Sequence, residues 1–135
     1  MASINSFEDL VIWQSAQELG VQVFDLSLKN LPISKDYSFK DQIKRAVLSI
    51  SNNIAEGFEY NNNNDFVRYL RIAKGSCGEV RNCLIFAIKI NYASKESLEP
   101  LIIQTKTLGS QIGKLLIYLK KLKATRHPQP ATRNP

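Results

Sequence analysis

The sequence predicts an all-α protein folded as an up-and-down antiparallel four-helix bundle. Apolar residues recur three and four positions apart along four long segments, as expected of amphipathic helices. Short stretches with Pro, Gly or several Asn residues separate these segments, and such stretches are typical of turns. No segment shows a convincing strand pattern. Because the connections are short, consecutive helices should lie side by side and run in opposite directions.

The first helix is expected to begin after Ser6 and to reach about Lys29. Ser6 can act as the N-cap, and Asp9 stands at the spacing of a capping box. The segment from Asn30 to Tyr37 contains Pro32 and has no periodicity, so it is expected to be a loop. The buried stripe of this helix is predicted to comprise Ile12, Ala16, Leu19, Val23 and Leu26.

The second helix is expected to be capped by Ser38 and to end near Gly57. A polar turn at 61–64 should then supply an N-cap, Asn64, to a third helix that reaches about Asn91. The predicted core residues of the second helix are Ile43, Val47, Ile50, Ile54 and Phe58. Those of the third are Phe66, Ala73, Cys77, Val80, Leu84 and Ala87, and Asn91 continues the same repeat.

The fourth helix is expected to start near Ser94 or Ser97, to accept Pro100 in its first turns, and to reach about Lys123. Its apolar residues keep a heptad spacing, which predicts antiparallel packing at about 20° to its neighbours. Gly109 and Gly113, one turn apart, indicate a close helix crossing. The heptad positions are Leu98, Leu101, Thr105, Leu108, Ile112, Leu115, Leu119 and Leu122.

Positive charge is concentrated toward the C-terminus, because all 12 acidic residues lie at or before Glu99 while the net charge is +6. The bundle is predicted to span residues 1–123, and the basic, Pro-rich tail at 124–135 is predicted to be disordered. This asymmetry fits contact with nucleic acid or another polyanion, and it equally fits a solvated helix end. The candidate nucleic-acid residues are Lys114, Lys120, Lys121, Lys123 and Arg126.

Catalytic chemistry is not expected. The one histidine, His127, falls in the tail, so a catalytic triad or a His-rich metal site cannot form in the core. Cys77 and Cys83 are six positions apart on one predicted helix, which suits neither a disulfide nor a zinc site. No Gly-rich phosphate-binding loop is present. The sequence therefore predicts a protein that is not an enzyme and that holds no cofactor and no metal.

A cytoplasmic location is expected. The longest nearly uninterrupted apolar stretch, residues 83–88, is far shorter than the roughly 18 residues of a membrane span, so no membrane contact is predicted. The N-terminal residues lack the basic start and the apolar run of a secretory signal.

The third helix carries apolar residues on more than one side, which predicts a second packing surface and hence a homo-oligomer. Gly75 and Gly78 would each cost up to about 1 kcal/mol in a helix interior, and close approach of another backbone would offset this. Polar residues on the second and third helices are either a solvated face or an inter-subunit network. We favour the network. The candidate interface residues are Arg45, Asn53, Glu56, Val67, Arg68, Arg71, Gly75, Ser76, Glu79 and Phe86.

Three ordered blocks make the sequence recognisable: it resembles the 23S rRNA intervening-sequence proteins, a four-helix-bundle family encoded within insertions in bacterial rRNA genes and elsewhere. The blocks are residues 7–14 (FEDLVIWQ), residues 42–57 and residues 66–80. Ser51 and Asn52 stand where the family commonly has Pro-Ser, so a helix kink expected there should be weaker.

The resemblance implies a ring-shaped homopentamer with no known catalysis and a suspected role with nucleic acid. The fold is also similar to the accessory subunit of diversity-generating retroelements, a basic pentamer that works with a reverse transcriptase. Two functions stay open. In the first, basic helix ends and tails repeated round the ring bind the RNA or DNA backbone. In the second, the protein is a scaffold or accessory subunit for another polypeptide, such as a reverse transcriptase, without nucleic-acid contact.

Overall fold

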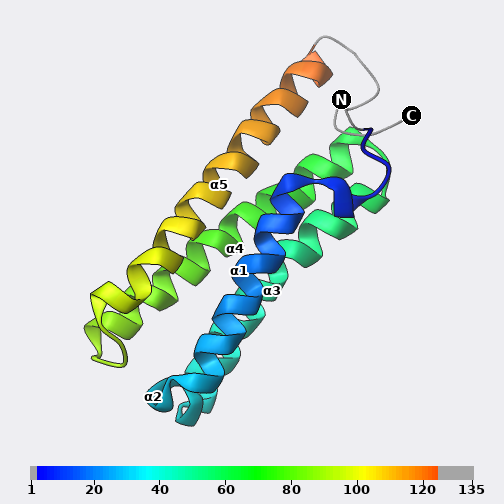
Figure 1. Ribbon diagram of the computed structural model, residues 1–135. Coiled ribbons are helices and arrows are strands. Elements are labelled where there is room, and N and C mark those ends of the chain that lie inside the picture. Colours follow the sequence, from blue (N-terminus) through cyan, green and yellow to red (C-terminus); the bar gives the residue numbers. More distant parts are fainter. Residues whose placement is uncertain (1–2, 125–135) are drawn as a thin grey trace.

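Four long helices make up most of the chain (Figure 1). The computed structural model describes residues 3–124, and all regular elements in this range are helical. Consecutive long helices run in opposite directions, which confirms the predicted all-α class and the order of the four segments. The long helices are α1 (Val11–Lys29), α3 (Tyr37–Glu59), α4 (Asn63–Lys89) and α5 (Lys95–Ala124).

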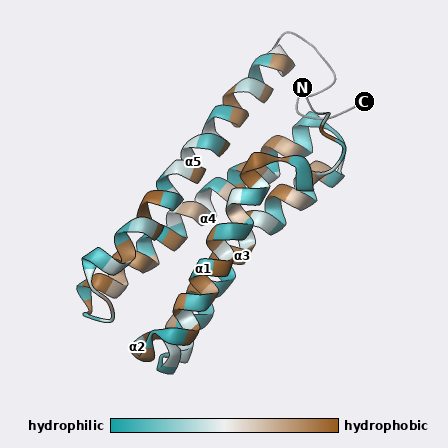
Figure 2. Ribbon diagram, viewed as in Figure 1, coloured by the Kyte–Doolittle hydropathy of each residue, from teal (hydrophilic) through white to brown (hydrophobic). Residues whose placement is uncertain are grey.

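One face of each long helix supplies the core. Apolar and polar residues alternate around the helices in Figure 2, and the apolar stripes predicted for α3 and α4 are buried. In α1 the predicted stripe is buried except for Leu26, which is half-buried. Within residues 3–124, no helix has both the length and the apolar composition that crossing a bilayer requires.

The heptad predicted for α5 holds except near its C-terminal end. The structure buries Leu116 and leaves Leu115 half-buried, whereas the heptad placed Leu115 in the core. The core positions between Ile112 and Leu119 are therefore spaced by four and then three residues, in place of three and then four, and Leu119 stays buried as predicted. Gly109 faces α4, and a Cβ there would be in ordinary van der Waals contact with the Cβ of Cys77 at 3.7 Å, so the predicted crossing is not so close that it requires glycine at this position.

The start of the chain differs slightly from expectation. The Ser6 hydroxyl accepts a hydrogen bond from the Glu8 N–H, and the Asp9 side chain accepts from the Ser6 N–H, so the predicted capping box is present. It caps a short 3-10 turn, Phe7–Asp9, and not α1 itself. Leu10 then takes an extended conformation before α1 begins.

The predicted loop at 30–37 is wrong in part, because it contains the short helix α2 (Leu31–Lys35). The Asn30 side chain accepts a hydrogen bond from the Ile33 N–H and caps this helix. Pro32 fits in its first turn, where a missing N–H costs nothing. Ile33 is fully buried, so core packing fixes a segment that lacks any repeat in the sequence.

The N-caps of α3 and α4 lie two residues before the predicted ones. Asp36, not Ser38, caps α3 by accepting from the Phe39 N–H at 3.0 Å, and Asn62, not Asn64, caps α4. The Tyr92 hydroxyl, after the end of α4, donates to the other Asp36 oxygen at 2.8 Å. The Phe39 N–H and then the Tyr92 hydroxyl hold the pKa of Asp36 below its usual range.

Candidate nucleic-acid interface

A groove of about 650 Å³ lies between α4 and α5. Glycines open it: a Cβ added at Gly75 or Gly78 would meet no atom within 4 Å. At Gly113 a Cβ would lie 3.1 Å from Cε of Lys74, so the Lys74 stem passes across the groove over α5. A ligand in this groove would meet helix backbone in place of side chains.

Five cations line the groove, and we call it the basic groove after them. Its cationic residues are Arg71, Lys74, Arg81, Lys106 and Lys120. No carboxylate is among the lining residues, and none of the five cations lies within 4.0 Å of a carboxylate oxygen in the described range. The charges therefore sum to a positive potential that is not neutralised locally.

The other residues that line the basic groove are uncharged. The Thr105 hydroxyl donates to the Ile102 carbonyl at 2.6 Å and is thereby engaged within α5. Burial raises the pKa of the Cys77 thiol to about 11, so this sulfur is protonated at neutral pH. Among residues 3–124 no group of three or more His, Cys, Asp or Glu is placed to hold a metal ion. Binding anions is what this arrangement can do.

The predicted nucleic-acid residues are only partly gathered here. Lys114, Lys120 and Lys121 are exposed on α5, and of these Lys120 lines the basic groove. The Lys123 side chain, Arg126 and the rest of the predicted tail beyond Ala124 lie outside the described residues.

Sequence reasoning missed four of the five groove cations. Arg71 was assigned to an oligomer interface, and Lys74, Arg81 and Lys106 were not singled out. The signal was present in α4, where residues 71, 74, 78 and 81 follow helical spacing and are all basic or glycine. Only the pairing of α4 with α5 shows that Lys106 and Lys120 face them.

The predicted interface residues differ in their surroundings. Ser76 is buried, and Asn53 and Val67 are half-buried. The exposed members are Arg45, Glu56, Arg68, Arg71, Gly75, Glu79 and Phe86. This distribution leaves most of the set available to a neighbouring subunit, and the interface stays a prediction.

Several polar members of that set bond within the chain and join α3 to α4. Ser49 and Ser76 share a hydrogen bond of 2.9 Å, and the Asn53 amide donates to the Ser49 hydroxyl at 2.9 Å. The Gln42 amide donates to the Glu79 carboxylate. These contacts explain part of the predicted polar network without a second subunit.

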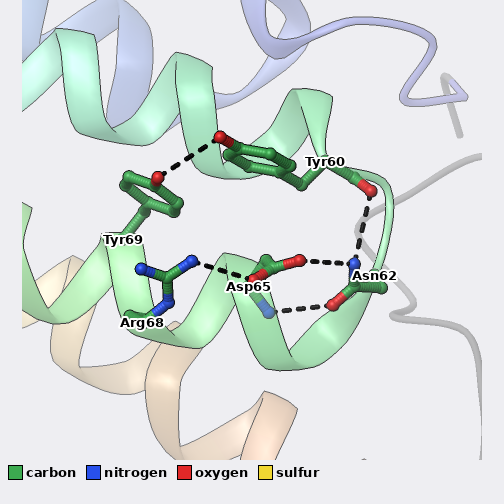
Figure 3. A network of polar contacts seen from close by, with 5 residues as sticks. All are labelled: Tyr60, Asn62, Asp65, Arg68 and Tyr69. Atoms are coloured by element: carbon green, nitrogen blue, oxygen red, sulfur yellow. Dashed lines mark hydrogen bonds and ion pairs between the residues drawn. The ribbon is translucent and has the colours of Figure 1, made fainter.

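A polar network organises the turn between α3 and α4 (Figure 3). The Asn62 amide donates to Asp65 at 2.7 Å, and Arg68 pairs with the other Asp65 oxygen at 3.0 Å. The Arg68 guanidinium also lies 4.8 Å from the ring centroid of Tyr69, which stacks on Tyr60 at 5.3 Å. Hydrogen bonding, first from Asn62 and then from Arg68, lowers the pKa of Asp65, so its carboxylate stays charged and holds Arg68.

Tyr69 contacts both the Tyr60 ring and the α3 backbone at Gly57. Its hydroxyl donates to the Tyr60 hydroxyl at 3.5 Å, and this bond is the main cause that raises the pKa of Tyr69 to about 12. On the α3 side its Cβ lies so near Gly57 that a Cβ there would be only 2.6 Å away. Arg68 therefore lies over the outer of two stacked tyrosine rings.

An exposed apolar surface lies between α1 and α3, away from the basic groove. It surrounds a pocket of about 310 Å³. Its exposed apolar residues are Val21, Phe24 and Leu48, with Leu28 next to them in a neighbouring pocket. Such a surface fits contact with another protein chain.

Comparisons with known proteins found a matching family model and a solved structure of similar fold. The model for the 23S rRNA-intervening sequence protein family matches residues 8–114. A solved protein of unknown function from the S23 ribosomal protein family of Bacteroides thetaiotaomicron VPI-5482 has 23% sequence identity and a TM-score of 0.74. The match covers 78% of this chain and 98% of that chain, and at this identity the likeness concerns the fold. No curated protein sequence matches the chain.

Proposed function

Because this chain belongs to the 23S rRNA-intervening sequence protein family, we propose that it is a non-enzymatic cytoplasmic protein that binds the phosphate backbone of RNA or DNA. The observation that carries the proposal is the basic groove, whose lining combines five cations with no carboxylate. Lysine and arginine that are free of ion pairs are what phosphate contacts require. The family name adds a reason to test RNA first.

The proposed binding depends little on base sequence. Phosphate contacts fix a nucleic acid on the protein without reading its sequence, which requires contacts to base edges. The glycines of the basic groove allow a phosphate to approach the helix backbone closely. The exposed Lys114 and Lys121 extend the positive surface along α5. Repetition of the groove in a homo-oligomer would make several weak contacts act together.

A salt titration tests this proposal. We expect the full-length protein to bind a labelled structured RNA and a duplex DNA in a fluorescence anisotropy assay at about 50 mM salt, and to bind them far more weakly at about 200 mM. The logarithm of the binding constant should fall linearly with the logarithm of salt concentration, by about 0.9 for each contacted phosphate. Absence of binding to both ligands at low salt would refute the function.

We propose further that the protein is a homo-oligomer, with a pentamer as the expected form. Phe86 on α4 and Ile90 at its C-cap are 51% and 36% exposed in the single chain. Complete burial of each is worth about 1.5–3 kcal/mol, and a partner subunit would recover much of the part now exposed. Light scattering coupled to gel filtration should show a mass several times 15.3 kDa at micromolar concentration. A 15.3 kDa species would contradict the assembly.

A protein scaffold is the second candidate function, and the apolar surface between α1 and α3 favours it. Leu28 and Val21 are 78% and 69% exposed there. Exposed apolar residues that lie next to one another, unlike single ones, are typical of a surface that contacts another protein. In this case the partner would be another polypeptide, such as a reverse transcriptase, and the protein would contact no nucleic acid. The salt titration separates the two functions, because a scaffold of this kind binds neither RNA nor DNA in it.

A further inference from the structure

A second pocket, which we call the end pocket, continues the basic groove. It has a volume of about 580 Å³ and lies between the first turns of α4 and the last described turns of α5. Arg71 and Lys120 line both the end pocket and the basic groove, so the two adjoin each other. A ligand seated in one can therefore extend into the other.

The end pocket differs from the basic groove in having apolar walls. Val67 and Ile72 of α4 and Leu119 of α5 line it, and Arg68, Arg71 and Lys120 stand around them. Phosphate alone gains nothing from apolar walls, since contact with them removes its hydration. A nucleotide matches both features, because its base is a flat, largely apolar ring and its phosphate is an anion.

Arg68 is shaped for a flat ligand. Its guanidinium lies between Asp65 at 3.0 Å and the Tyr69 ring at 4.8 Å (Figure 3). Since Asp65 balances much of its charge, Arg68 contributes a planar surface more than a free cation. Unpaired bases stack on arginine planes as well as on aromatic rings.

Asn63 supplies an independent indication. It lines the end pocket and is 9% exposed, and its Oδ1 atom is buried without a hydrogen-bond partner among the described residues. Burying an acceptor without a hydrogen bond is unfavourable, so such a group calls for an explanation. Rotation of the amide toward the pocket would let it bond to the polar edge of a base.

We propose that the end pocket takes up the base of an unpaired nucleotide, with the flanking phosphates of the strand on Arg71 and Lys120 and continuing into the basic groove. This inference rests on the proposed nucleic-acid function and names its substrate class as single-stranded or looped nucleic acid. In an uninterrupted duplex the bases are stacked and paired, and a base must lose both its pairing and its stacking before it can enter a pocket. Apart from its cations, the described lining offers a base edge only the side-chain amides of Asn63 and Asn64, so it captures a base without selecting a sequence.

Two substitutions that keep the net charge test the end pocket. Ile72→Ala removes an exposed apolar wall, and Arg68→Lys keeps the charge but removes the planar surface. Ile85→Ala is the matched control, because Ile85 is an exposed isoleucine of the same helix outside the end pocket. The ligands are a single-stranded oligonucleotide and a blunt duplex matched for the number of phosphates, and circular dichroism verifies that each variant is folded.

Ile72→Ala and Arg68→Lys are each expected to weaken binding of the single strand by about fivefold, as loss of one contact to a base would. Binding of the duplex and the slope of the salt dependence should not change, and Ile85→Ala should behave as wild type. An excess of mononucleotide should compete poorly, because it cannot occupy the basic groove.

Other outcomes overturn the inference. Equal weakening for both ligands, or no weakening for either, would show that no base enters the end pocket while leaving the backbone binding intact. Strong competition by the mononucleotide would reassign the pocket to a free nucleotide. A changed mass of either variant in light scattering would show that a neighbouring subunit covers the pocket. Absence of binding by the wild-type protein to both ligands would refute the proposed function itself.

Discussion

Replacing Arg71 and Lys106 together with glutamine is expected to weaken nucleic-acid binding by roughly thirtyfold at about 0.15 M salt. The two residues stand on opposite walls of the basic groove, Arg71 on α4 and Lys106 on α5. Each phosphate contact adds about 0.9 to the salt slope, which corresponds to roughly fivefold in affinity at this salt concentration. Anisotropy titrations at several salt concentrations measure both the affinity and the slope.

A control of equal charge separates local contact from net charge. Lys29→Gln with Lys35→Gln removes the same two charges from the end of α1 and from α2. Lys29 is an exposed partner of Asp25, and such surface pairs contribute little to stability. If this control weakened binding as much as the groove variant, overall charge and not the basic groove would be responsible.

Gly57→Ala is expected to lower the free energy of unfolding by about 1–3 kcal/mol, because the added methyl group has no room. Its Cβ would lie 2.6 Å from the Cβ of Tyr69 and 3.3 Å from Cδ1 of Phe66. The Tyr69 Cβ is fixed to the α4 backbone, so relief requires α3 and α4 to move apart. Urea unfolding followed by circular dichroism, at one fixed protein concentration, gives the difference.

Gly20→Ala is the matched substitution for this measurement. Gly20 lies inside α1, and a Cβ there would meet no atom within 4 Å. Alanine should therefore raise the free energy of unfolding by about 0.5–1 kcal/mol through its higher helix propensity. If Gly57→Ala and Gly20→Ala had the same free energy of unfolding, Tyr69 would not lie as close to Gly57 as the structure shows.

The glycines also show where sequence reasoning reaches its limit. The sequence assigned close backbone approach to Gly75 and Gly78, yet within the chain these two open the basic groove, and Gly57 makes the tightest contact. A glycine inside a helix indicates that a side chain at this position would be unfavourable. Whether the reason is a neighbouring helix, a ligand or another subunit depends on how the helices are paired, which the sequence pattern does not contain.

The long helices and most of their core positions could be predicted, because the apolar repeat is strong over many turns. The short helix α2 could not, since its five residues hold no repeat and Ile33 is fixed by tertiary packing. The candidate site could be predicted only in part. Lys120 was predicted from the charge asymmetry, whereas Lys106 joins Arg71 in a groove only through the contact between α4 and α5.

Tyr92 ties three connections together at one end of the bundle. Its hydroxyl donates to Asp36, its carbonyl accepts from the Asn30 amide at 2.9 Å, and its ring meets Phe39 edge-on at 5.9 Å. These three contacts hold the turn between α4 and α5 in place. The end pocket lies toward the opposite ends of the same two helices. Tyr92 contributes nothing to the lining of the end pocket, so substitutions at this end should change the stability of the bundle and leave the shape of the pocket as it is.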